Sequence, residues 1–127
     1  MRLEDDINRV AVELEHYAKK LDHEATRYWE LHNKRFKYIT RLTGELIEKL
    51  ERSGCSVERI LDVGNSFQTL MINRVRPDLQ MDTMGFWDER YRPDGTTKHH
   101  DFDLNDAYYP ERWLVSEEQN KYDIILF

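Results

Sequence analysis

The sequence contains one cysteine, Cys55, and only three prolines and five glycines among its 127 residues. A single cysteine excludes an intramolecular disulfide and a cysteine-rich zinc site. No apolar run approaches membrane-spanning length, and the charged residues 2–6 do not resemble a secretory leader. From these absences we expect a protein of the reducing cytoplasm that does not enter a membrane.

The chain also lacks an excess of positive charge. It carries 19 basic and 25 acidic residues, which gives a net charge of −6. General binding to nucleic acid is therefore not expected, because affinity for a polyanion comes from clustered Lys and Arg. The local basic run at residues 34–37 is typical of the solvent-exposed face of a helix. The length suits one hydrophobic core at most.

A helical period occupies residues 1–52, where apolar residues recur at steps of three and four. The stripe changes phase near His32 and Asn33, which predicts a bend there. The pattern fits either a coiled-coil seam or a helix laid over a core. Its aromatic residues could form a lid over a ligand, but we favour packing for each of them. These residues are Tyr17, Tyr28 and Trp29.

From residue 57 the period changes to short apolar runs bounded by Gly, Pro and Asp. These runs predict alternating strands and helices, which is typical of an α/β fold with a parallel sheet. The expected strands are 58–64, 79–86, 97–104 and 122–127, and the expected helices are 66–76 and 110–119.

The run 59–66 is the most informative segment. An apolar strand ends at Asp62, Gly64 permits a tight turn, and Ser66 is suited to begin a helix. A strand, a glycine turn and a helix start form the first part of a nucleotide-binding βαβ unit. An acid before the glycine disfavours a diphosphate and suits a ligand with an ammonium and a sulfonium.

Residues 59–127 resemble the first half of a class I S-adenosylmethionine-dependent methyltransferase. The resemblance rests on residues 60–64, the acidic loop 102–107 and the strand-like run 121–127. It implies a truncated Rossmann-like sheet of strands 1–4 in the order 3-2-1-4. A helical N-terminal arm, residues 1–56, would precede the cofactor-binding half, residues 57–127. We expect the N-terminal part of a longer enzyme, inactive alone, with an unidentified methyl acceptor.

The resemblance also implies which residues contact S-adenosylmethionine. Asp62 would face the methionine ammonium at a turn formed with Gly64, Asn65 and Ser66. The ribose hydroxyls would be held by an acid after the second strand, for which we choose Asp88 over Asp82, because Asp82 falls within the strand. The adenine amino group would be bound by Asp106, with Asp103 as the alternative.

Two features depart from the family. Its second and third glycines are replaced by Ser66 and Gln68. The link between the second and third strands is too short for the usual crossover helix, so the helix is reduced or the strands pair as a hairpin.

Alternative interpretations remain at this point. On a strand His99, Asp101 and Asp103 would share one face and could bind a metal, but we favour an exposed polar face. The whole chain could instead be a nicotinamide dinucleotide-binding domain or a non-enzymatic helical interaction module. We also expect self-association, through the edge of the fourth strand or the apolar stripe of residues 7–28.

Overall fold

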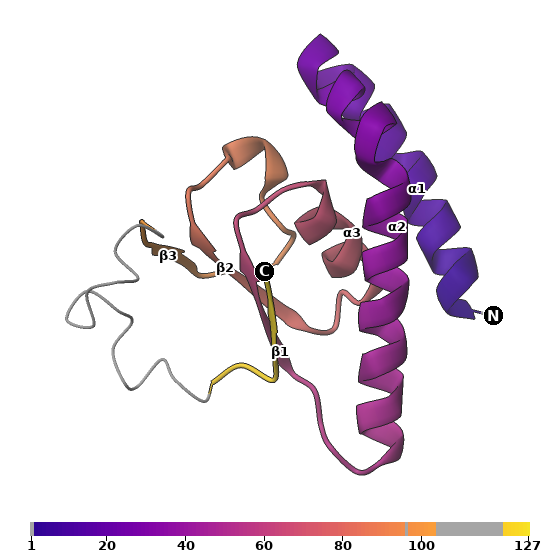
Figure 1. Cartoon of the computed structure of the whole chain (residues 1–127), viewed down its shortest axis with the longest axis vertical. Coiled ribbons are helices and arrows are strands. Elements are labelled where there is room, and N and C mark those ends of the chain that lie inside the picture. Colours follow the sequence, from indigo (N-terminus) through magenta and orange to yellow (C-terminus); the bar gives the residue numbers. More distant parts are fainter. Residues whose placement is uncertain (1, 96, 104–120) are drawn as a thin grey trace.

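The computed structural model describes residues 2–95, 97–103 and 121–127. Figure 1 shows a sheet covered on one side by α3 and by a long helical hairpin. The four described strands are all parallel and lie in the order β3-β2-β1-β4, which confirms the α/β class and the expected order. The elements are α1 (Arg2–Leu21), α2 (His23–Arg52), β1 (Arg59–Val63), α3 (Phe67–Val75), β2 (Gln80–Gly85), η1 (Glu89–Tyr91), β3 (His99–Asp101) and β4 (Ile124–Leu126). The helix predicted at 110–119 lies outside the described residues.

Strands β2 and β3 pair in parallel, with Thr83 opposite His99 and Gly85 opposite Asp101. The hairpin alternative is therefore excluded. Both strands are shorter than predicted, so the link runs from 86 to 98 and reaches the length of about a dozen residues that a parallel crossover requires. The short helix η1 stands where a full crossover helix is usual.

The predicted bend at His32 and Asn33 is wrong, because α2 runs through both residues. The chain turns instead at Asp22, which is extended (φ −172°, ψ −179°) and caps α2 by accepting a hydrogen bond from the Ala25 N–H at 2.7 Å. Asn33 is tolerated inside the helix because its amide donates to the carbonyl oxygens of Trp29 and Glu30.

The apolar stripe of α1 is buried within the chain. Ile7, Val10 and Leu14 are fully inaccessible and belong to one core with residues of α2 and α3. The first helix is therefore laid over the core, and its stripe is not left as a seam for another molecule. No helix in the described part of the chain is long and apolar enough to cross a membrane.

The sheet face opposite α3 carries a buried polar network around Asp82, which is fully inaccessible. The carboxylate accepts hydrogen bonds from Arg59 Nη2 (2.7 Å), the Tyr122 hydroxyl (2.9 Å), Gln80 Nε2 and the Lys98 N–H. Burial alone would raise the pKa of Asp82, but these four donors outweigh it and lower the pKa. Asp82 thus acts as a structural anchor that joins β2 to the residues at or just before the starts of β1, β3 and β4.

Removing this anchor is expected to destabilise the fold. Asp82→Ala should lower the free energy of unfolding by about 3 kcal/mol at pH 7, because it leaves the Arg59 charge without its buried partner. Urea unfolding measures this loss. Asp78→Ala, which removes an exposed partner of Arg76, is the control and should cost less than about 1 kcal/mol. Similar losses in the two variants would contradict the assigned role of Asp82.

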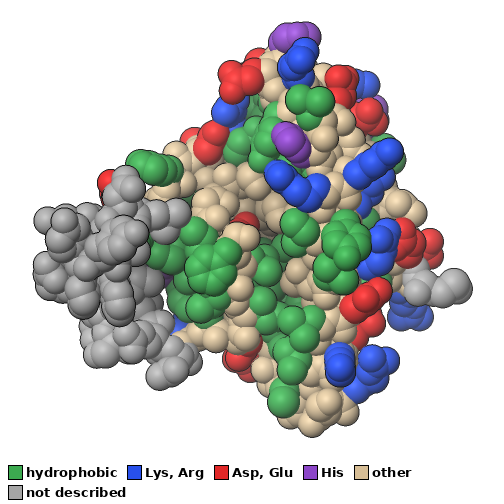
Figure 2. Space-filling model, in the orientation of Figure 1, with side chains coloured by type: hydrophobic (Ala, Val, Ile, Leu, Met, Phe, Trp, Pro, Cys, Tyr) green, Lys and Arg blue, Asp and Glu red, His purple; other side chains and the backbone are tan. Residues whose placement is uncertain are grey.

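Strand β4 pairs with β1 on one side, and no described strand pairs with its other side. Ile125 at this edge is 49% exposed and Phe127 is fully exposed. Figure 2 shows hydrophobic side chains gathered on the face along which α2 runs. An open strand edge beside apolar surface is suited to pairing with another chain.

We therefore expect concentration-dependent self-association through the β4 edge. Ile125→Lys should reduce the association seen by sedimentation velocity, because a charge opposes edge-to-edge pairing. Val12→Lys places the same charge at a comparably exposed position on α1 and should change nothing. A monomer at every concentration, or equal effects of the two substitutions, would argue against this edge.

Candidate functional site

The site lies at the carboxyl ends of β1 and β2, where two glycines adopt positive φ. Gly64 (φ +79°) donates its N–H to the Met84 carbonyl at 2.7 Å, and Gly85 has φ +98°. A Cβ at Gly85 would lie 3.7 Å from the Gly64 nitrogen, whereas a Cβ at Gly64 would enter open space. The backbone of the first turn is therefore accessible to a ligand.

Ser66 begins α3 as predicted. Its hydroxyl accepts a hydrogen bond from the Gln68 N–H at 3.1 Å, and its own N–H donates to Thr69 Oγ1 at 2.9 Å in a reciprocal capping box. Residues at the end of β1 and the start of α3 are thereby held in a defined arrangement.

Asp62, the last acid of β1, is 5% exposed and points to the α3 side of the sheet. Its Oδ2 accepts a hydrogen bond from the Thr69 hydroxyl at 2.5 Å. Burial raises the pKa of Asp62 to about 6, and the Thr69 hydrogen bond opposes the rise. No Lys or Arg of the described residues forms an ion pair with it. The carboxylate of Asp62 is thus buried without a neutralising cation from the described part of the chain.

A cavity of about 340 Å³ opens beside this carboxylate. It brings together three of the predicted residues, Asp62, Gly64 and Ser66. Its other wall comes from α2 residues Arg35, Phe36 and Ile39, which the sequence did not assign to the site. The lining consists of Arg35, Phe36, Ile39, Asp62, Val63, Gly64, Ser66, Gln68 and Phe127. We call this space the turn cavity.

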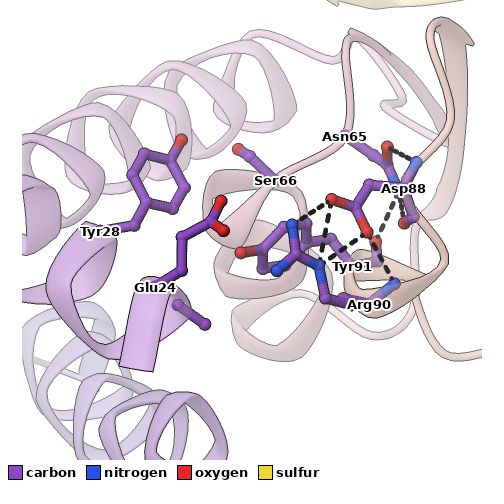
Figure 3. Close-up of a pocket in the computed structure, with 8 residues that line it drawn as sticks. Glu24, Tyr28, Asn65, Ser66, Asp88, Arg90 and Tyr91 are labelled. Atoms are coloured by element: carbon purple, nitrogen blue, oxygen red, sulfur yellow. Dashed lines mark hydrogen bonds and ion pairs between the residues drawn. The ribbon is translucent and has the colours of Figure 1, made fainter. Parts of the chain in front are cut away.

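A second cavity of about 290 Å³ lies next to Ser66, between the start of α2 and the loop after β2. Figure 3 shows Glu24 and Tyr28 on the α2 side, facing Arg90 and Tyr91 of the loop. Asn65 is part of this lining, together with Ala25, Ser66 and Asp88.

The Asn65 side chain is engaged with the loop after β2. Its amide donates to the carbonyl oxygens of Asp88 (2.7 Å) and Tyr91 (3.1 Å), and its Oδ1 accepts from the Asp88 N–H at 2.9 Å. The side chain of Asn65 thus connects the turn after β1 to the loop after β2 and holds the two segments together.

Asp88 lies after β2, as the chosen ribose acid should, and lines the second cavity. Its carboxylate accepts from Arg90 Nη2 at 2.8 Å, from Arg90 Nε and from the Arg90 N–H. The Arg90 hydrogen bond is the main reason that the pKa of Asp88 is lowered. Asp82, the alternative ribose acid, is buried on the sheet face opposite α3 and lines neither cavity.

The aromatic residues near the site have separate roles. Phe86 is 77% exposed after β2, whereas Trp87 packs on the His99 ring at 5.0 Å and donates to Glu89. Trp29 is buried in the core, and the Tyr17 hydroxyl donates to the Arg90 carbonyl. Of the three candidate lid aromatics, Tyr28 lines the second cavity beside Ser66.

The other predicted ligands do not converge in the described residues. His99 bonds to the Thr83 hydroxyl at 2.8 Å, and no described cluster of three or more His, Cys, Asp or Glu side chains could hold a metal ion. Asp106 lies outside the described residues, and its alternative, Asp103, is exposed after β3.

Comparison of the chain with models of protein families, with curated proteins and with solved structures finds no match. A function is therefore inferred from the residues of the site and their geometry.

The raised pKa of Asp62 leads to a stability prediction. Asp62 binds a proton more tightly in the folded protein than in the unfolded chain, so the contribution of Asp62 to stability should fall as the pH rises from about 4 to 6 and then stay low. The shift corresponds to about 3 kcal/mol. Asp62→Asn should therefore raise the free energy of unfolding at pH 7 by up to about 3 kcal/mol.

Urea unfolding at pH 4 and pH 7 measures this effect, and Asp101→Asn, an exposed change on β3, is the control. A variant with Asn at position 62 that is less stable than the parent at pH 7 would show that the carboxylate has a structural role.

Proposed function

We propose that this chain is the cofactor-binding half of an S-adenosylmethionine-dependent methyltransferase with a Rossmann-like sheet. The observation that supports the proposal most is the buried carboxylate of Asp62, which no described Lys or Arg neutralises, beside the open backbone of Gly64. It lies at the carboxyl edge of a parallel sheet, where open α/β folds bind their ligands. A carboxylate without a cation in that position is suited to receive a ligand's ammonium.

The lining of the turn cavity is compatible with this cofactor. Asp62 offers an anion to the ammonium, and Gly64 leaves room for close approach. Ser66 and Asn65 would hold the turn in shape, as their hydrogen bonds indicate. When bound, the cofactor would supply a methyl group on a sulfonium for in-line transfer to an acceptor nucleophile.

The protein's part in such a reaction is mainly to position the reactants and to exclude water. Asp62 would orient the amino-acid end, while Asp88 would exchange its hydrogen bonds to Arg90 for the two ribose hydroxyls. Asp106 is proposed to bind the adenine amino group. The methyl acceptor and the catalytic residues are not assigned.

The two alternative functions have less support. A dinucleotide would bring its diphosphate to the first turn, where the buried Asp62 carboxylate would repel it. A helical interaction module would have to use α2, where Leu42 and Leu46 are each 46% exposed, because the stripe of α1 is covered by α2 and α3.

The proposal is tested by calorimetric titration with S-adenosylhomocysteine. The parent protein should bind it, and Gly64→Ala should weaken binding at least tenfold because a methyl group enters the ligand's space. Gly54→Ala is a matched control, since Gly54 has a similar φ (+87°) and equally open surroundings away from the site. The two variants should lose similar stability, about 1–2 kcal/mol.

Equal affinity in the parent and the Gly64 variant would contradict the assignment of the turn. Binding of a nicotinamide dinucleotide in preference to S-adenosylhomocysteine would favour the rival function.

A further inference from the structure

The solvent-exposed side of α2 differs in charge from the rest of the chain. Each residue of an α-helix turns by about 100°, so a strip of exposed residues lies within about 60° of Leu31 around the helix axis. We call this strip the α2 face. Its acidic residues are Glu24 and Glu45, and its basic residues are Arg27, Lys34, Arg35, Lys49 and Arg52. The face is therefore positively charged, although the net charge of the chain is −6.

The cations of the α2 face are not neutralised by neighbouring acids. None of them forms an ion pair within the described part of the chain, and the Arg35 guanidinium lies 5.4 Å from the centroid of the Phe36 ring. Within the basic run 34–37, Lys34 and Arg35 are exposed, whereas Lys37 lines a cavity between α1 and α2. The positive charge of the face is thus available to an external anion.

Apolar side chains are interspersed among these cations. Leu31 is 65% exposed, Tyr38 is 57% exposed, and Leu42 and Leu46 are each 46% exposed. Figure 2 shows basic and hydrophobic side chains side by side along α2. The opposite side of the helix is buried in the core, which fixes the α2 face outward. Exposed leucines among Lys and Arg are typical of a helix that lies in the headgroup region of a membrane.

Two other kinds of partner suit the α2 face less well. A partner helix would require a heptad seam, but the register that includes most of the apolar residues also includes Arg35, Glu45 and Lys49. A nucleic acid would bind the cations through its phosphates and would leave the leucines without an apolar contact. A lipid surface engages both kinds of side chain.

We propose that the α2 face is a docking site for the surface of an anionic phospholipid bilayer. The Lys and Arg side chains bind the headgroup phosphates and carboxylates, while the leucines and Tyr38 enter between the headgroups. The face extends about 38 Å from Arg27 to Arg52, so the helix lies parallel to the membrane plane. This inference does not depend on the proposed function.

Co-sedimentation with lipid vesicles tests the docking site. The parent protein should bind vesicles of phosphatidylcholine with about one third phosphatidylserine roughly tenfold more tightly than pure phosphatidylcholine vesicles, and added salt should weaken this binding. Arg27→Glu combined with Lys34→Glu should reduce the affinity for the anionic vesicles roughly tenfold. Leu31→Gln should reduce it roughly threefold, because it removes an inserted apolar side chain and no charge.

Each variant has a matched control on α1. Lys19→Glu combined with Lys20→Glu makes the same charge change at exposed positions, and Val12→Gln is the control for Leu31→Gln. Both controls should keep the parent's affinity, and circular dichroism should show that every variant is folded. Either α2 variant alone suffices for the test.

The proposal would be overturned if the parent protein showed no preference for the anionic vesicles, or if the α1 and α2 variants lost equal affinity. Vesicle binding that Leu31→Gln leaves unchanged would also overturn it, and equally tight binding of heparin would then indicate a general polyanion site.

Discussion

The packing of the α1–α2 hairpin against α3 is the constraint on which the rest of the structure depends. Phe67, the first residue of α3, is fully buried among aromatic rings, with centroid distances of 4.8 Å to Tyr91 and 5.3 Å to Trp29. Tyr28 and Phe36 complete this cluster. Because Phe67 directly follows the turn after β1, the same contacts that seat the hairpin also fix the turn and bring α2 to the cavity. Of the aromatic residues considered as a lid, Tyr28 and Trp29 belong to this cluster.

Asp62 is less well compensated than the other buried carboxylate, Asp82. Asp82 is buried more deeply, yet four donors including a guanidinium compensate it. Asp62 has a single hydroxyl donor and a raised pKa. Natural sequences accept such local losses of stability chiefly where function requires them. This contrast distinguishes the structural carboxylate of Asp82 from that of Asp62, which we propose to be available to a ligand.

Much of the fold was predictable because its signals are local. The apolar runs of β1 and β2 end at glycines, Ser66 has the chemistry of a helix cap, and Pro77 limits α3. The break at Asp22 was missed because the apolar stripe continues through Leu21 and Ala25 as if one helix spanned both.

The composition of the site was predictable only on its β1 side. Asp62, Gly64 and Ser66 are adjacent in sequence, so their convergence follows from one turn. The contribution of Arg35 depends on how α2 packs on α3, which is a tertiary contact between distant segments. Gln68 was recognisable in the sequence only as a missing glycine, and its bonds to Phe36 and Thr40 could not be inferred from that.

We propose that the buried Asp62 carboxylate is available to bind a cationic group of the ligand. The most direct test is to follow the ¹³C resonance of the Asp62 side-chain carboxyl through a pH titration, with and without S-adenosylhomocysteine. We expect the Asp62 carboxyl to have a pKa of about 6 in the free protein and a lower pKa when the ligand's ammonium is bound. A pKa that is unchanged by saturating ligand would contradict it.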